Sequence, residues 1–223
     1  GEIPPIEFIH VAETAGLIND LGIYVIEQAC AQIERWRQLG FDTPVVAVNV
    51  STMQLWQPDF VQRLRGAMRR HGVAVGDLCL ELTESALINR EQAQHQQVLR
   101  ELADLGVCLS IDDFGTGFSS LNYLKNLPVD AIKIDRTFVK DLSTSSADQA
   151  IAASIITLGK NLDMLIVAEG IETAEQADFL IRNGCDLAQG FYYGHPVSAS
   201  DAEQFLHPDD LLHCNIAHRP VAK

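Results

Sequence analysis

Oxygen-bearing side chains recur along this sequence directly after short apolar segments. Five of them are candidate metal ligands: Asn49, Glu81, Asp112, Asp113 and Glu169. Carboxylate and amide oxygens are hard ligands, and no histidine or cysteine accompanies them at metal-site spacing, so the set favours Mg²⁺ or Mn²⁺ over Zn²⁺. Because one Mg²⁺ usually takes only about one or two carboxylates from a protein, the pattern predicts two ions.

Two divalent ions about 3.5–4 Å apart are a known arrangement for phosphodiester hydrolysis, since they activate water and stabilise the leaving oxygen. Consecutive residues at the end of a strand diverge, so one of Asp112 and Asp113 could bridge two ions while the other binds only the second. Lys133 would hydrogen-bond the attacking water or a phosphate oxygen, and Glu169 could be a ligand, a proton acceptor or both. We therefore predict Asp112, Lys133 and Glu169 as catalytic residues.

Short apolar, β-branched segments alternate with amphipathic helices. The predicted strands are Val45–Val50, Leu78–Leu82, Val107–Ile111, Ala131–Ile134, Leu165–Ala168 and Asp186–Gln189. Several of them are apolar almost throughout, as expected for parallel strands covered on both faces. The alternation predicts a parallel α/β fold.

Three helices have readable ends. One begins at Asn19 or Asp20 and stops at Gly40, another covers Glu91–Leu105, and a third opens with the capping-box sequence Thr173-x-x-Gln176. The predicted apolar stripe of the first helix consists of Leu21, Val25, Ala29, Ile33 and Trp36.

Every predicted strand ends in a polar group, and this recurrence separates two α/β architectures. In a (β/α)₈ barrel the active site draws one residue from each of several strand ends, whereas an open sheet uses mainly one switch point. A single acidic residue after a strand is more often a helix N-cap or a solvated loop residue. Polar ends on all six strands favour the barrel, and because a barrel needs eight strands, we expect the other two to precede residue 1.

The composition narrows the possible partners and the compartment. The net charge is −14, and the 16 Lys and Arg residues are scattered, which argues against binding of long nucleic acid. The five cysteines form no C-x-x-C motif and are odd in number, which is typical of a reducing compartment. With no apolar stretch near the ~20 residues of a membrane span, we expect a cytoplasmic domain, either free or belonging to a membrane-anchored protein. We expect one domain at residues 1–206 and a solvated tail at 207–223.

Several motifs resemble, in order, those of the EAL domain family. They are Val48-Asn49-Val50-Ser51, Glu81-Leu82-Thr83-Glu84-Ser85, Asp112-Asp113-Phe114-Gly115-Thr116-Gly117-Phe118-Ser119-Ser120, Leu127-Pro128-Val129-Asp130, Lys133-Ile134-Asp135-Arg136, Ala168-Glu169-Gly170-Ile171-Glu172-Thr173 and Gln189-Gly190-Phe191. The segment from Glu7 to Glu13 matches as well. The resemblance covers about Ile3 to Pro196, and the Asp-Asp motif is its most specific part.

The resemblance implies a TIM-like barrel that hydrolyses cyclic-di-GMP to linear pGpG with Mg²⁺ or Mn²⁺. It implies the metal ligands named above, Lys133 next to the catalytic water, and Glu169 as the group that helps to activate this water. It also implies that Glu84 anchors the loop after Asp113, which shapes the second metal site and a homodimer surface. Glu172 and Gln189 would complete the inner shell.

The chain departs from the family in one respect, because the tripeptide Glu-Ala-Leu, whose Glu is a metal ligand, occurs nowhere in it. We expect this motif about ten residues upstream of Gly1, and weak activity from the chain as given. We also expect the native protein to carry sensory or diguanylate-cyclase-like domains. A non-catalytic cyclic-di-GMP receptor is the alternative function, and an unrelated metal-dependent barrel hydrolase is a further one.

Overall fold

The computed structural model describes residues 3–87, 92–117 and 124–206. Its centre is one six-stranded parallel sheet in the order β1-β2-β3-β4-β5-β6, so every strand pairs with its neighbours in the chain. The strands are β1 (Val46–Val50), β2 (Leu78–Thr83), β3 (Cys108–Phe114), β4 (Ala131–Ile134), β5 (Leu165–Ala168) and β6 (Leu187–Ala188). The six predicted strands and the parallel α/β fold are therefore confirmed.

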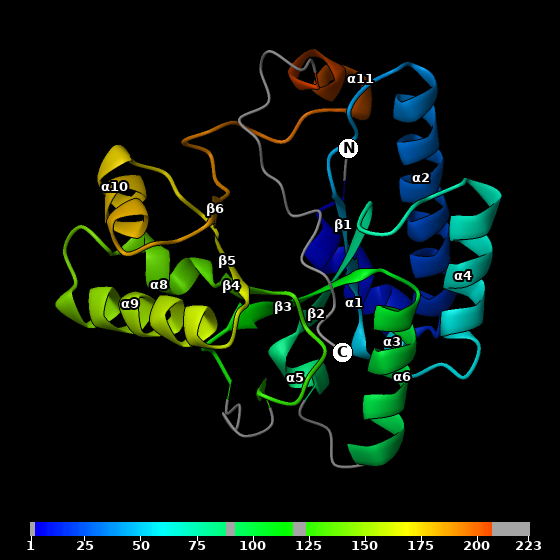
Figure 1. Cartoon of the computed structure of the whole chain (residues 1–223), viewed down its shortest axis with the longest axis horizontal. Coiled ribbons are helices and arrows are strands. Elements are labelled where there is room, and N and C mark those ends of the chain that lie inside the picture. Colours follow the sequence, from blue (N-terminus) through cyan, green and yellow to red (C-terminus); the bar gives the residue numbers. More distant parts are fainter. Residues whose placement is uncertain (1–2, 88–91, 118–123, 207–223) are drawn as a thin grey trace.

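Helices connect the strands and pack on one side of the sheet (Figure 1). Helices α2, α4 and α6 lie along the half that carries β1 to β3, whereas α8, α9 and α10 lie along the half that carries β4 to β6. The described helices are α1 (Pro5–Thr14), α2 (Ile18–Gln38), α3 (Thr52–Leu55), α4 (Phe60–Arg70), α5 (Glu84–Leu87), α6 (Gln92–Asp104), α8 (Arg136–Lys140), α9 (Ser146–Asn161), α10 (Ala174–Arg182), α11 (Ala199–Ala202) and the 3₁₀ turn η1 (Glu203–Phe205). The predicted capping box of α10 is present, since Thr173 Oγ1 accepts from Gln176 N at 3.3 Å and Gln176 Oε1 accepts from Thr173 N at 3.0 Å.

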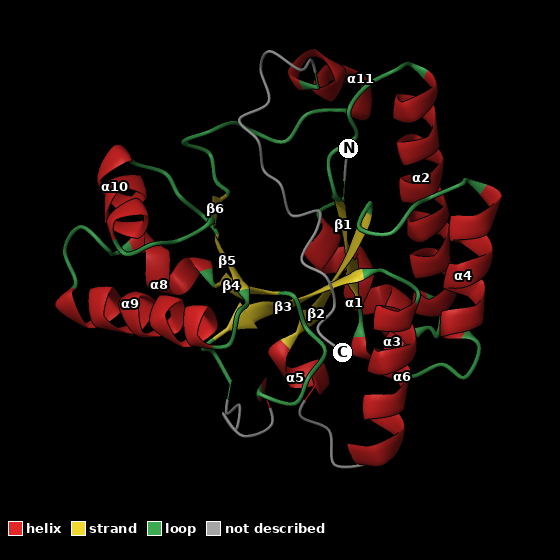
Figure 2. Ribbon diagram, viewed as in Figure 1, coloured by secondary structure: helices red, strands yellow, loops and turns green. Residues whose placement is uncertain are grey.

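The sheet curls into a half-barrel (Figure 2). Within the described ranges, β1 and β6 each pair with one strand only and form the two edges. Side chains of a strand alternate between its two faces. In β2, Leu78, Leu80 and Leu82 share the face that packs against the helices and are fully buried. The intervening Cys79, Glu81 and Thr83 point to the inner, concave side and are only partly buried. The polar ends of the strands thus gather on this inner side.

Two details differ from the sequence-based expectations. The buried stripe of α2 is shifted: Gly22, Ile26, Cys30 and Ile33 are buried, whereas Val25 is 42% exposed. The strands are also not covered equally on both faces, since Ala47 and Asn49 on the inner side of β1 are exposed. The predicted tail at 207–223 lies outside the described residues. Among the helices of the described ranges, none has the length and apolar character needed to cross a bilayer.

Candidate active site

Lys133 lies at the centre of a cluster of carboxylates on the inner side of the sheet. Its Nζ atom lies 2.5 Å from Glu169 Oε1, 2.7 Å from Glu81 Oε1 and 3.4 Å from Asp112 Oδ1. The Lys133 side chain is only 6% exposed. Glu81 comes from β2, Asp112 from β3 and Lys133 from β4, while Glu169 follows the last residue of β5. Four side chains predicted to act together are therefore assembled from four neighbouring strands.

The charges in this cluster support one another. Burial alone would lower the pKa of Lys133, but its hydrogen bonds to Glu169 and Glu81 outweigh burial and raise that pKa above its ordinary value. The ammonium therefore stays protonated at neutral pH. Burial raises the pKa of Glu169, and the nearby Lys133 offsets only part of this effect. Glu169 consequently takes up a proton more readily than an exposed glutamate, as a proton acceptor in catalysis must.

Asp112 and Asp113 point to different partners because the backbone bends between them. The pairing of β3 with β4 shifts register between Ile111 and Phe114, and Asp113 has a left-handed backbone with φ of 54°. Aspartate tolerates this conformation better than most residues do. Asp112 contacts Lys133, whereas the side chain of Asp113 hydrogen-bonds that of Asp135. Two consecutive carboxylates thus serve two positions of the site.

Asp135 was not among the predicted site residues, although it follows β4 two positions after Lys133. It caps α8, accepting a hydrogen bond from Thr137 N at 2.9 Å. Burial would raise its pKa, but the hydrogen bonds from Thr137 lower it overall, whereas burial and the charge of Asp112 raise the pKa of Asp113. The pKa values of the two neighbouring carboxyls are thus shifted in opposite directions, upward for Asp113 and downward for Asp135.

Glu84 is 3% exposed and begins α5 directly after β2. Its Oε2 atom accepts hydrogen bonds from Gly115 N at 3.0 Å and from Gly117 N at 3.3 Å. A Cβ atom at position 117 would lie 2.7 Å from Glu84 Oε1, so only glycine fits there without displacement. Glu84 thereby holds the segment that follows Asp113. The last three residues of the Asp-Asp motif, Phe118, Ser119 and Ser120, lie outside the described residues.

The remaining predicted residues lie around this centre. Asn49 is exposed on the edge strand β1 and is paired in register with Glu81, so both occupy the inner side of the sheet. Glu172 forms an ion pair with Arg136 at 2.6 Å. Gln189 follows β6, and its backbone is held next to the end of β5 because its N–H donates to Ala168 O at 2.8 Å. Arg136 is a further charged residue that the predictions did not include.

The donor set fits hard divalent ions. Glu81, Asp112 and Glu169 already converge on one cationic atom, and Asn49 and Asp113 lie on the strands beside them. Among the residues that the structure describes, no three His, Cys, Asp or Glu side chains are arranged as a ready metal cage, since the Lys133 ammonium lies between the carboxylates.

Comparison with known proteins identifies the family. The model of the EAL domain matches residues 1–196. The chain belongs to the EAL domain family. This chain is 43% identical over 206 residues to the bifunctional diguanylate cyclase/cyclic di-GMP phosphodiesterase MucR of Pseudomonas aeruginosa, covering 92% of this chain and 30% of MucR. It is 41% identical over 206 residues to the cyclic di-GMP phosphodiesterase NbdA of the same organism, covering 92% of this chain and 26% of NbdA.

Solved EAL structures have the same fold. The MucR phosphodiesterase in complex with c-di-GMP matches with a TM-score of 0.85 at 43% identity, covering 89% of this chain and 80% of that one. The EAL domain of Mycobacterium smegmatis DcpA matches with a TM-score of 0.81 at 40% identity, covering 85% of each chain. The six parallel strands therefore belong to a TIM-like barrel of the EAL type, as predicted. The chain spans less than a third of the two curated relatives.

Proposed function

We propose that this EAL domain hydrolyses cyclic-di-GMP to linear pGpG with the help of two Mg²⁺ or Mn²⁺ ions. The observation that carries the proposal is the convergence of Glu81, Asp112 and Glu169 on Lys133 within 3.4 Å. The MucR and NbdA relatives, both named as cyclic di-GMP phosphodiesterases, support the choice of substrate. The ligands of the ions would be Asn49, Glu81, Asp112, Asp113 and Glu169.

The residues of the chain divide the reaction between them. Bound divalent ions would lower the pKa of a water molecule and neutralise charge on the phosphate. Glu169, whose pKa burial raises, accepts a proton as the water attacks phosphorus. One phosphorus–oxygen ester bond breaks, and the leaving ribose oxygen takes a proton from solvent to become a hydroxyl. Lys133 keeps its proton and donates a hydrogen bond to the attacking water or to a phosphate oxygen. Low accessibility strengthens both interactions, because the local dielectric constant falls.

The surrounding residues hold this arrangement in place. Glu84 fixes the loop after Asp113 through Gly115 and Gly117, and we assign it the role of a loop anchor. We assign Glu172 and Gln189 to the inner shell of side chains around the metal ions. The same loop would lie at a homodimer surface.

The native protein and its setting are part of the proposal. The relatives are about three to four times longer than the matched region, which supports fusion to sensory or diguanylate-cyclase-like domains. The proposed location of the domain is the cytoplasm. Turnover by the 223-residue chain itself is expected to be weak, because the half-barrel has two open edges and lacks the Glu-Ala-Leu carboxylate.

Product analysis tests the function directly. The chain is incubated with cyclic-di-GMP and Mn²⁺, and pGpG is quantified by chromatography, with Glu169→Gln and a sample without metal as controls. We expect pGpG only from the metal-containing wild type. A version that carries the upstream strands should turn over faster. Tight binding of cyclic-di-GMP without any product in either version would contradict the proposal and indicate a receptor.

A further inference from the structure

Gln54 is a buried glutamine just past the end of β1. It is 4% exposed and forms a capping box with Ser51: Ser51 N donates to Gln54 Oε1 at 3.1 Å, and Gln54 N donates to Ser51 Oγ at 3.3 Å. Ser51 follows Asn49 by two residues. The side chain of Gln54 therefore fixes the direction that the backbone takes immediately after Asn49.

The other end of the Gln54 amide is held against α2. A Cβ atom at Gly22 would lie 1.4 Å from Gln54 Nε2 and 2.3 Å from its Cδ, so the amide occupies the space that any side chain at position 22 would fill. Gly22 is buried in the second turn of α2. Glycine is unfavourable inside a helix, and this close approach is the physical reason for its presence.

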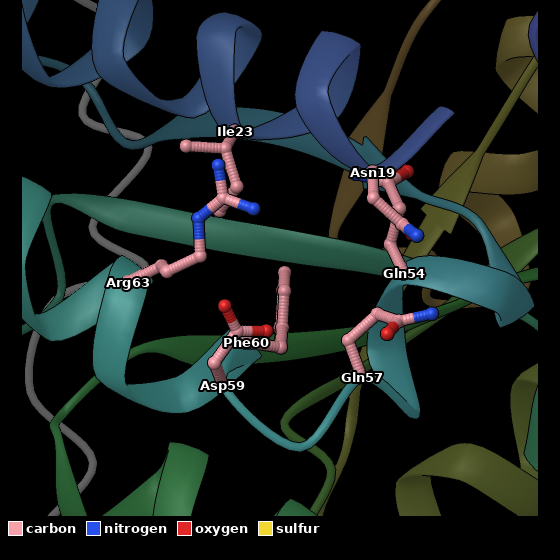
Figure 3. Close-up of a pocket in the computed structure, with 7 residues that line it drawn as sticks. All are labelled: Asn19, Ile23, Gln54, Gln57, Asp59, Phe60 and Arg63. Carbon is pink, nitrogen blue, oxygen red and sulfur yellow. The ribbon is translucent and has the colours of Figure 1, made fainter. Parts of the chain in front are cut away.

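The contact is not explained by a gain in hydrogen bonding. Figure 3 shows Gln54 and Asn19 at a small cavity of about 10 Å³ between α2, α3 and the start of α4. Gln54 Nε2 and Asn19 Oδ1 are both buried and have no hydrogen-bond partner in the structure. A buried donor without a partner is destabilising. An apolar side chain of the same size would avoid this penalty but would lose the acceptor for Ser51 N.

The segment is also held from the opposite side. Trp56, next to α3, stacks on His95 of α6 with a centroid distance of 3.6 Å and an angle of 18° between the rings. The short helix that follows Asn49 is thus fastened to α2 by Gln54 and to α6 by Trp56. Within the described part of the chain, Asn49 lies on an edge strand whose single paired neighbour is β2.

We propose that Gln54 is a positioning residue that orients the side chain of Asn49 toward the metal site. The absence of a side chain at Gly22 leaves the space that Gln54 occupies. The proposal rests on the function assigned above, in which Asn49 binds a divalent ion. Gln54 would act through the backbone of Ser51 and would not touch the ion or the substrate. Removing it should loosen Asn49 while the Lys133 cluster, which comes from other strands, stays assembled.

Titration of Mn²⁺ into the 223-residue chain, with free Mn²⁺ measured by electron paramagnetic resonance, tests this role without any turnover. We expect Gln54→Met and Gly22→Ala each to weaken Mn²⁺ binding at least fivefold, and the double variant to be no worse than either single one. Gly66→Ala is the matched control, since a Cβ there meets only the flexible end of Arg70 at 3.2 Å and should leave affinity within twofold. Unchanged affinity in Gln54→Met with a lower unfolding temperature would overturn the proposal. It would show that Gln54 only stabilises the start of α3.

A second readout does not depend on the metal. In ¹H–¹⁵N spectra of the metal-free chain, we expect Gln54→Met to shift the side-chain amide signals of Asn49 and to speed hydrogen exchange at Ser51 N, with no such change in Gly66→Ala. Gln54→Glu keeps the acceptor for Ser51 N and should lie between wild type and Gln54→Met, which covers the case in which Gln54→Met does not fold. A wild type that binds no Mn²⁺ would refute the proposed function alone, whereas unaltered Asn49 and Ser51 signals would refute the positioning role.

Discussion

Lys133 Nζ and Glu169 Oε1 lie 2.5 Å apart, although Lys133 belongs to β4 and Glu169 comes directly after β5. The same ammonium contacts Glu81 and Asp112, so one buried cation offsets part of the charge of three carboxylates. Removing one partner of a buried ion pair is strongly destabilising, because the remaining charges stay buried without compensation.

Replacing Lys133 should therefore affect stability in a pH-dependent way. We expect Lys133→Met to lose about 3–5 kcal/mol of unfolding free energy at pH 7. Burial and mutual repulsion raise the folded-state pKa of a carboxyl such as Glu169, so its protonation favours the folded state as the pH falls. The deficit relative to wild type should shrink between pH 7 and about pH 4, as measured by urea denaturation. A deficit that is constant over this range would contradict the role of the ammonium.

The wild type itself should show the opposite dependence at alkaline pH. The pKa of Lys133 is raised in the folded chain above its ordinary value of 10.5. Its stabilising contribution is therefore complete below pH 10.5 and is lost as the pH rises through the folded-state pKa. Denaturation curves of wild type and Lys133→Met should converge above pH 10.5, and a constant gap would show that the charge of Lys133 is not what stabilises the cluster.

Glu169→Gln should separate catalysis from folding. Because burial raises the pKa of Glu169, a neutral glutamine relieves part of the unfavourable burial while it still accepts a hydrogen bond from Lys133. We expect the unfolding temperature to change little, while kcat falls by about 10²–10⁴-fold, the usual contribution of a proton-transferring group. Glu175→Gln, at an exposed position in the first turn of α10, is the control and should keep wild-type turnover. Comparable kcat values in both variants would rule out Glu169 as the proton acceptor.

Glu84 should couple the loop after Asp113 to turnover. Glu84→Ala leaves the N–H groups of Gly115 and Gly117 without this acceptor, which should cost about 1–3 kcal/mol of stability. Glu84→Gln retains one carbonyl oxygen and should show a smaller loss. Hydrogen exchange at the two glycine amides and kcat are measured on the same variants. Faster exchange without any loss of kcat would show that the order of this loop does not affect turnover.

Divalent ions should stabilise the folded chain by mass action. At a free Mn²⁺ concentration about 100 times the dissociation constant, we expect a gain of about 2.7 kcal/mol for each bound ion, reversed by a chelator. Asp112→Asn should lose most of this gain because it removes a carboxylate from the cluster. Calorimetry of both proteins with and without Mn²⁺ measures the effect; an equal gain in Asp112→Asn would place the ions elsewhere.

The strands and their polar ends could be predicted from the sequence because both depend on local patterns. Leu78–Leu82 and Ala131–Ile134 are short apolar segments, and parallel pairing then brings Glu81 and Lys133 to the same inner side. Convergence of carboxylates from separate strands follows from that register.

What could not be predicted depends on contacts between distant residues. The stripe of α2 was right for Ile33 and Trp36 but wrong for Val25, and it missed Gly22, which carries no hydrophobic signal and packs against Gln54. The contact between Asp113 and Asp135 depends on the left-handed backbone of Asp113, which residue spacing does not reveal. The ion pair of Arg136 with Glu172 depends on how the loops after β4 and β5 meet.

The ammonium of Lys133 has a consequence for how such a domain can be handled and used. Since an internal cation offsets part of the charge of the carboxylates, we expect the polypeptide to reach its native shape without imported ions. Under the proposed function, withdrawal of manganese or magnesium would then stop turnover, and their return would restore it with no round of refolding. At the bench, the same property would let the protein be stripped with chelator and reloaded with a chosen ion.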